Sequence, residues 1–229
     1  MSDADPLQRE PAPMSDLFAT AVHRFGNAWA DLVAATAVVV AIAFVPVLVV
    51  SSSHGASDVF VASVFAFGVA YFVLLGFVVL RGLPPSAPAP RGQVVGTYAV
   101  AVVTGLVAGL LVLVLQPYAV VPLPALLLVV PAVAAGDASA FRAFLAGPRL
   151  AFRNFTRTWT MWTLTILFCA PIVIAMFLML TSVAGSVAAT LLALALSAPI
   201  AWPVSALFIR ALYGDLTGRA VVAPQDRTR

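Results

Sequence analysis

The stretch Phe141–Leu180 reads FRAFLAGPRLAFRNFTRTWTMWTLTILFCAPIVIAMFLML, and its two halves differ sharply in character. The first half carries Arg142, Arg149, Arg153 and Arg157. The second half has no charged side chain. A hydrocarbon core about 30 Å thick is crossed by about 20 helical residues, so the second half predicts a membrane-spanning helix. Basic residues beside spans stay cytoplasmic, so the arginines predict the side on which this helix begins.

The rest of the chain repeats this pattern. The predicted spans are 32–51, 59–80, 94–115, 118–135, 159–181 and 187–209. All 12 basic residues are arginines, and they lie before the first span, in every second connection and after the last span. The other connections, 52–58, 116–117 and 182–186, contain none. This alternation predicts an all-α, six-span multi-pass protein with both termini in the cytoplasm.

Composition supports lipid as the main solvent of this chain. Hydrophobic residues make up 62% of it and charged residues 9%, whereas a soluble domain is about half apolar and about a quarter charged. The net charge of +3 is too small to suggest a nucleic-acid partner. The absence of lysine beside many alanines, valines and arginines suggests a GC-rich prokaryotic genome, so we expect a prokaryotic plasma membrane.

The domain organisation follows from these spans. We expect residues 1–14 to be a disordered tail, 15–220 to form the membrane domain and 221–229 to form a second tail. The fourth span contains three prolines and directly follows a fourth, Pro117, which predicts either a kinked crossing or a re-entrant segment. The crossing is favoured, because a re-entrant segment would place the arginines at 142–157 outside.

Amphipathic helices are predicted at the cytoplasmic interface before spans one and five. In 15–30 apolar side chains recur at helical spacing, ending in Trp29 at headgroup level. In 137–158 aromatic residues up to Trp159 share one face and the four arginines another, with a break into two helices expected at Gly147-Pro148. We expect Arg142, Arg149, Arg153 and Arg157 to contact anionic lipid headgroups. Alternatively, they only set the topology.

Two further features bear on packing. Gly105 and Gly109 form a GxxxG pattern, which serves either a dimer face or, as we favour, packing against another span of this chain. A weak match between the starts of 15–80 and 149–209 is compatible with parallel repeats and equally with chance.

Catalytic chemistry has no visible basis in this sequence. No charged residue lies deep in a span, and no motif for a nucleophile, a phosphate or a dinucleotide occurs. Cys169 is the only cysteine, and His23 and His54 are predicted on opposite sides of the membrane. We therefore expect no enzyme activity, no metal and no cofactor.

The end of the chain predicts a polar junction. Tyr213 and Asp215 follow the last span and are flanked by Arg210 and Arg219. We expect Tyr213 to be an interfacial anchor, and Asp215 to pair with Arg219 or with Arg149 or Arg153.

Two motifs carry a family resemblance. GDASAFR at 136–142, followed by RLAFRNF at 149–155, precedes the fifth span, and LYGDLTGR at 212–219 follows the last one. In this order they resemble the family named for the membrane domain of glycerophosphoryl diester phosphodiesterases, over about 15–219. Thr156 and Thr217 depart from that family's usual residues. The resemblance implies a six-helix membrane module without the catalytic barrel, so it supplies no catalytic residue.

The leading functional hypothesis is a non-enzymatic membrane protein that acts on lipid or is organised by it. It would be a scaffold, a membrane-homeostasis factor or a partner subunit, working with membrane lipids and with a second copy or another membrane protein. The alternative is a permease for an apolar or zwitterionic solute.

Overall fold

The computed structural model describes residues 11–52, 55–83, 89–181 and 186–218, and every regular element in these ranges is a helix. The elements are α1 (Met14–Ser51), α2 (Ala56–Arg81), α3 (Arg91–Leu115), the 3-10 helix η2 (Gln116–Val120), α4 (Leu123–Leu126), α5 (Val129–Ala134), α6 (Ala140–Arg153), α7 (Phe155–Thr181) and α8 (Ser186–Leu216). In the described ranges five helices, α1, α2, α3, α7 and α8, are long and apolar enough to cross a membrane. The all-α prediction is confirmed, and these helices are compatible with a multi-pass membrane protein.

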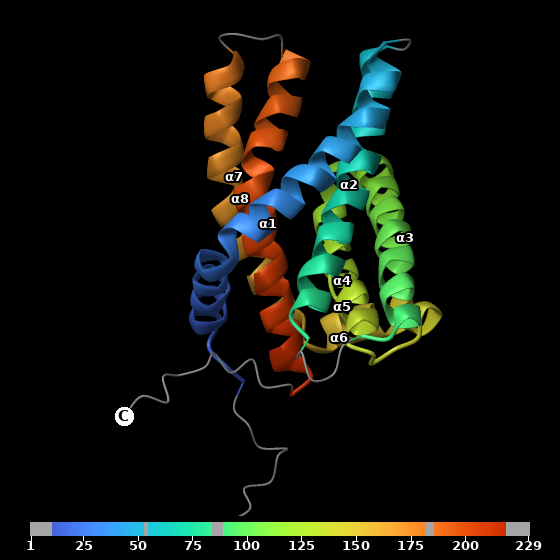
Figure 1. Ribbon diagram of the computed structural model, residues 1–229, viewed down its shortest axis with the longest axis vertical. Coiled ribbons are helices and arrows are strands. Elements are labelled where there is room, and N and C mark those ends of the chain that lie inside the picture. The colour runs from blue at the N-terminus through green and yellow to red at the C-terminus, as the bar shows by residue number, and fades with distance from the viewer. Residues whose placement is uncertain (1–10, 53–54, 84–88, 182–185, 219–229) are drawn as a thin grey trace, which may run out of the picture.

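The long helices form two antiparallel hairpins, α1–α2 and α7–α8, which point the same way. Figure 1 shows both hairpins reaching the upper end of the molecule, while the described chain begins and ends at the lower end. α1 crosses the outside of α8 on its way up, and α3 lies beside α2 on the far side. The predicted tails, 1–14 and 221–229, lie outside the described residues apart from 11–14.

The fourth predicted span differs most from expectation. Instead of one long helix, 118–135 forms η2, α4 and α5, because its prolines lack the backbone N–H that a continuous helix needs. All residues from Pro124 to Ala134 are buried. Backbone carbonyls freed by proline cannot face lipid, and packing among α2, α3 and α6 keeps this segment away from it.

This proline-rich segment nevertheless runs back along the whole of α3. It begins where α3 ends, and at its other end the Gln93 side-chain Nε2 donates a hydrogen bond of 2.7 Å to the Ala134 carbonyl. Gln93 lies in the first turn of α3. The segment therefore returns to the level at which α3 started, and it delivers α6 to the end of the molecule that carries both described chain ends.

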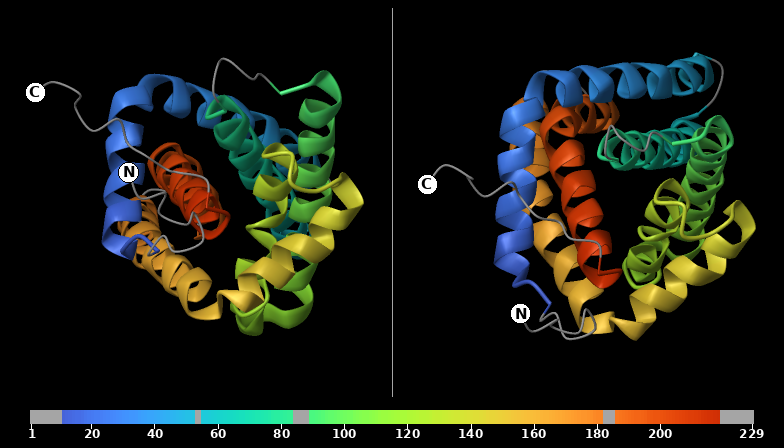
Figure 2. Two further views of the ribbon diagram at one scale, coloured as in Figure 1. Left: turned by 90° about the horizontal axis from the view of Figure 1, so that it is seen from below. Right: turned by 60° about the horizontal axis from the view of Figure 1, so that its bottom comes forward.

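α1 is bent at Ala28, within its first half. Ala28 has a non-helical backbone (φ −129°, ψ 21°), which separates the first part of α1 from the long span. Figure 2 shows this first part and α6 both extending across the lower end of the molecule, on different sides of α8. The first part buries Leu17 and Ala21, and the Phe18 ring lies edge-on to Phe208 with centroids 5.4 Å apart.

Candidate functional site

α6 packs on the bundle through a face of small residues. Ala143, Gly147 and Ala151 are buried and recur every fourth position, which places them on one side of a helix. A Cβ on Gly147 would lie 2.8 Å from the Val129 backbone nitrogen. Only glycine therefore allows α6 to lie this close to α5.

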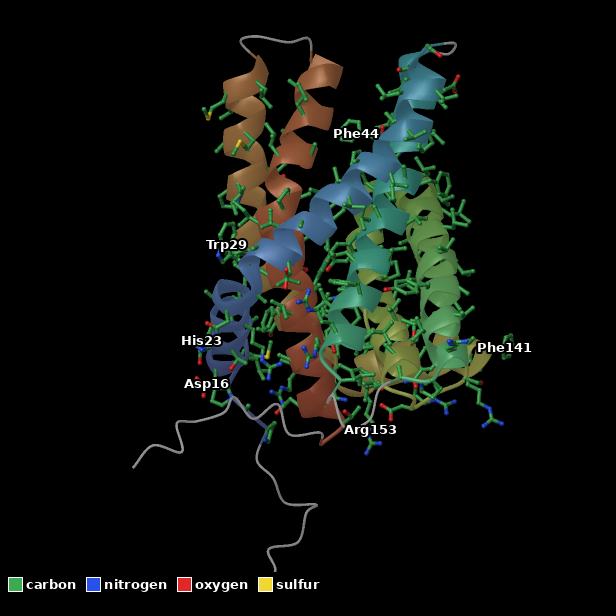
Figure 3. The ribbon with its side chains drawn as sticks, viewed as in Figure 1. Asp16, His23, Trp29, Phe44, Phe141 and Arg153 are labelled. Atoms are coloured by element: carbon green, nitrogen blue, oxygen red, sulfur yellow. The ribbon has the colours of Figure 1, made fainter. Side chains whose placement is uncertain are left out.

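A second face of α6 is apolar and exposed. Phe141, Leu145 and Phe152 are 82%, 65% and 57% exposed. At about 100° of rotation per residue, these three positions lie within about 40° of one another. Figure 3 shows Phe141 standing away from the body of the protein. Three large apolar side chains on a single strip of surface suit contact with lipid.

The third face of α6 carries the exposed arginines. Arg142, Arg149 and Arg153 also fall within about 40° of one another, about 80° around the helix from the apolar strip. Figure 3 shows Arg153 at the lower end of the molecule. The apolar strip and the arginine strip thus lie side by side on the part of α6 that faces away from the bundle, as expected of a helix lying at a membrane boundary beside a protein.

The expected break at Gly147-Pro148 is absent, and α6 is continuous through both residues. The break lies at Asn154 (φ −114°, ψ 43°), after which α7 begins at Phe155. The Asn154 side chain donates to the Leu150 carbonyl at 3.0 Å and so closes the last turn of α6. Pro148 removes only one backbone donor, and the close packing of Gly147 on α5 holds the helix together around it.

Arg157 lies apart from the other three arginines. Its Nη1 is 2.6 Å from Oδ2 of Asp215, an ion pair without the alignment of a hydrogen bond, with side-chain exposures of 22% and 13%. Its Nη2 donates to the Ala12 carbonyl at 2.5 Å, and the Ala12 N–H donates to Asp215 Oδ1 at 3.0 Å. These contacts join α7, α8 and the segment before α1. We call Ala12, Arg157 and Asp215 the terminal junction.

The terminal junction differs from the pairing expected for Asp215. Arg149 and Arg153 are exposed on α6, and Arg219 lies outside the described residues. Ala12, which falls in the tail predicted to be disordered, is fixed by two hydrogen bonds. No side-chain pattern indicates this partner, because the groups that bind are the backbone N–H and carbonyl of Ala12.

The three aromatic residues expected at the interface have different surroundings. Trp29 is exposed on α1, and Trp159 is partly buried and stacked on Phe155 with ring centroids 4.2 Å apart. Tyr213 is buried, and its hydroxyl donates to Asp137 Oδ2 at 2.6 Å. This bond links Asp137, at the end of the proline-rich segment, to α8.

Another ion pair was not expected. Arg81 at the end of α2 pairs with Asp31 of α1, and both side chains are exposed. The predicted topology could have indicated this pair, since Asp31 directly precedes the first span and Arg81 directly follows the second. Two adjacent spans of opposite direction bring these positions to the same membrane face.

Gly105 and Gly109 lie against α2 of the same chain. A Cβ on Gly105 would lie 2.5 Å from Val69 Cα, and one on Gly109 would lie 2.7 Å from a ring carbon of Phe65. The GxxxG face of α3 therefore packs against α2 of the same chain. In the part of the chain that the structure describes, no three His, Cys, Asp or Glu side chains gather as metal ligands would.

The chain was compared with protein-family models, with curated proteins and with solved structures. None of these comparisons finds a match. Functional inference for this protein therefore depends on the geometry of α6, the terminal junction and the membrane-spanning helices.

Proposed function

We propose that this chain is a multi-pass plasma-membrane protein that binds anionic lipid headgroups with α6. The observation that carries the proposal is the order of the three faces of α6. With its small residues against the bundle and Phe141, Leu145 and Phe152 in the acyl region, the arginine strip lies at the level of the phosphates. Such a protein acts as a lipid-organising scaffold or as a subunit for another membrane protein. The resemblance to the membrane domain of glycerophosphoryl diester phosphodiesterases implies only a six-helix membrane module without the catalytic barrel.

The same proposal includes six passages of the chain through the bilayer. Five are the long helices, and the sixth is the proline-rich segment 118–135, shielded from lipid by its neighbours. Its return along α3 supports this count. Both termini and α6 then lie on the cytoplasmic face, where anionic lipid is concentrated.

Topology is testable with single cysteines in a Cys169→Ser background. We expect Ser139→Cys to react with a membrane-impermeant maleimide only after the cytoplasmic face is opened, and Ser52→Cys to react in intact cells. The cysteine-free Cys169→Ser protein is the unlabelled control, and the wild-type protein shows how much Cys169 itself is labelled. Labelling of Ser139→Cys from outside would contradict six passages.

Headgroup binding is testable by the lipid that copurifies with the full chain. Replacing Arg142, Arg149 and Arg153 with glutamine should reduce bound phosphatidylglycerol at least about tenfold at low salt, because each arginine near an anionic surface contributes about 1 kcal/mol. Bound phosphatidylcholine should not change. The measurement is native mass spectrometry from mixed-lipid nanodiscs.

The control for this experiment is Arg81→Gln, which removes a cytoplasmic-side arginine whose charge is already balanced by Asp31. It should leave the retained phosphatidylglycerol close to the wild-type amount. Equal phosphatidylglycerol retention by wild type and the triple variant would refute headgroup binding by α6.

A further inference from the structure

A cavity of about 470 Å³ lies between the α7–α8 hairpin and the side of the molecule formed by α2, α3 and α4. Figure 1 shows the hairpin diverging from α2 above this level. The volume falls within the roughly 300–1,000 Å³ of small-molecule sites. All side chains on its wall are neutral, and most are apolar. Burying a charged ligand there would be costly, so the wall selects a neutral, apolar one.

The wall also holds polar hydrogens without acceptors. Tyr71 of α2 and Ser205 of α8 share one hydrogen bond of 2.6 Å between their hydroxyls, and Ser205 is 4% exposed. Two hydroxyls carry two protons, and their mutual bond uses only one. The second hydroxyl proton has no acceptor among the described residues. A ligand that enters the cavity can supply one.

Trp162 of α7 adds a second donor of this kind. It also lines the cavity, and its indole nitrogen is buried without an acceptor in the described ranges. Buried tryptophan N–H groups usually have a partner, and leaving one unpaired is unfavourable. The site therefore has spare donors at two points of an apolar wall.

The position of the cavity indicates where its ligand comes from. Its wall belongs to α2, α3, α7 and α8, all long enough to span a bilayer, and to α4. α7 packs along α8 and meets α4 only briefly, and Ile166 of α7, which lines the cavity, is exposed. An apolar molecule dissolved in the bilayer interior can reach the cavity through the seam between α4 and α7.

We propose that this cavity binds a neutral apolar molecule of the bilayer interior through a carbonyl oxygen, which accepts the spare hydroxyl proton of the Tyr71–Ser205 pair. Two lipid-phase sources carry such a carbonyl, a prenyl quinone and a diacylglycerol. This site is independent of the headgroup contacts proposed for α6, since the two share no residue.

The thiol of Cys169 lines the cavity, and because it is the only cysteine it reports on occupancy directly. We would measure its rate of modification by methyl methanethiosulfonate in detergent-solubilised full chain by intact-protein mass spectrometry. Decylubiquinone and dioctanoylglycerol are the two carbonyl probes, and tetradecane is the hydrocarbon control. At least one carbonyl probe should slow the modification in a saturable way, and tetradecane should not.

The double variant Tyr71→Phe with Ser205→Ala removes both hydroxyl protons of the pair and should weaken protection by the active probe about fivefold, as expected for one neutral hydrogen bond. Tyr98→Phe, a tyrosine outside the cavity wall, is the matched control and should behave like wild type. If the double variant does not elute as wild type does, Tyr71→Phe with Ser205→Gly makes the same test.

The pattern of protection separates the sources. Protection by the quinone alone or by the acylglycerol alone identifies the source, and protection by both supports the shared carbonyl. Protection by tetradecane equal to that of the carbonyl probes would overturn the proposal, as would no protection by any probe. Unchanged protection in a variant that lacks both hydroxyls and elutes as wild type does would overturn it as well.

Discussion

Asp215→Asn is expected to lower the free energy of unfolding by about 3 kcal/mol. Removing one partner of a buried ion pair leaves an uncompensated charge and costs about 3–5 kcal/mol; the partial exposure of Arg157 favours the lower end. Asparagine keeps an oxygen that can accept from the Ala12 N–H, so this variant isolates the loss of charge. Unfolding in mixed dodecylmaltoside and dodecyl sulfate micelles, followed by circular dichroism, measures the effect.

The exposed pair Asp31–Arg81 provides the matched control. Exposed ion pairs contribute about 0–1 kcal/mol, so Asp31→Asn should change stability little. The double variant Asp215→Asn with Arg157→Gln should be more stable than the sum of the single losses predicts, because no unpaired charge remains. Equal destabilisation by Asp31→Asn and Asp215→Asn would show that the terminal junction does not stabilise the fold.

Gly105→Ala should destabilise the protein by about 3 kcal/mol, the upper part of the range for overpacking. The new Cβ would meet Val69 Cα at 2.5 Å and Val69 N at 2.7 Å, which are backbone atoms that no side-chain rotation can move away. α2 and α3 would have to separate along the crossing that buries the centre of the bundle. The same micelle unfolding assay measures the loss.

Gly92→Ala is the control on the same helix. A Cβ at this position meets nothing within 4 Å, and alanine is a better helix former than glycine. Stability should therefore stay level or rise slightly. A Gly105→Ala variant as stable as Gly92→Ala would mean that α2 and α3 do not approach each other this closely.

Much of the fold could be predicted because hydropathy and arginine placement act over whole segments. Each long helix carries an apolar run of about bilayer length, and no tertiary contact is needed to recognise it. Hydropathy alone did not predict the structure of residues 118–135. Their hydropathy matches that of a span, but their prolines prevent one continuous helix, and whether neighbours shield the result depends on packing.

The candidate site was predictable where it depends on one helix and not where it joins several. The apolar and arginine faces of α6 follow from helical periodicity, so Phe141 and Arg149 fall on the faces expected for them. The terminal junction combines positions 12, 157 and 215, and its backbone partner leaves no trace in the side-chain pattern. Spacing alone also could not reveal that Tyr213 turns inward to Asp137.

The burial of Pro124–Ala134 has a consequence for how the protein is made. A translocon that released each hydrophobic segment into lipid as it emerged would leave the proline-freed carbonyls of this one without partners. The helices that cover this segment are α2 and α3, which are synthesised before it, and α6, which is synthesised after it. Under the proposed six-passage topology we therefore expect these pieces to be held together until the chain has grown past Arg153, so that the middle third of the protein inserts as one unit.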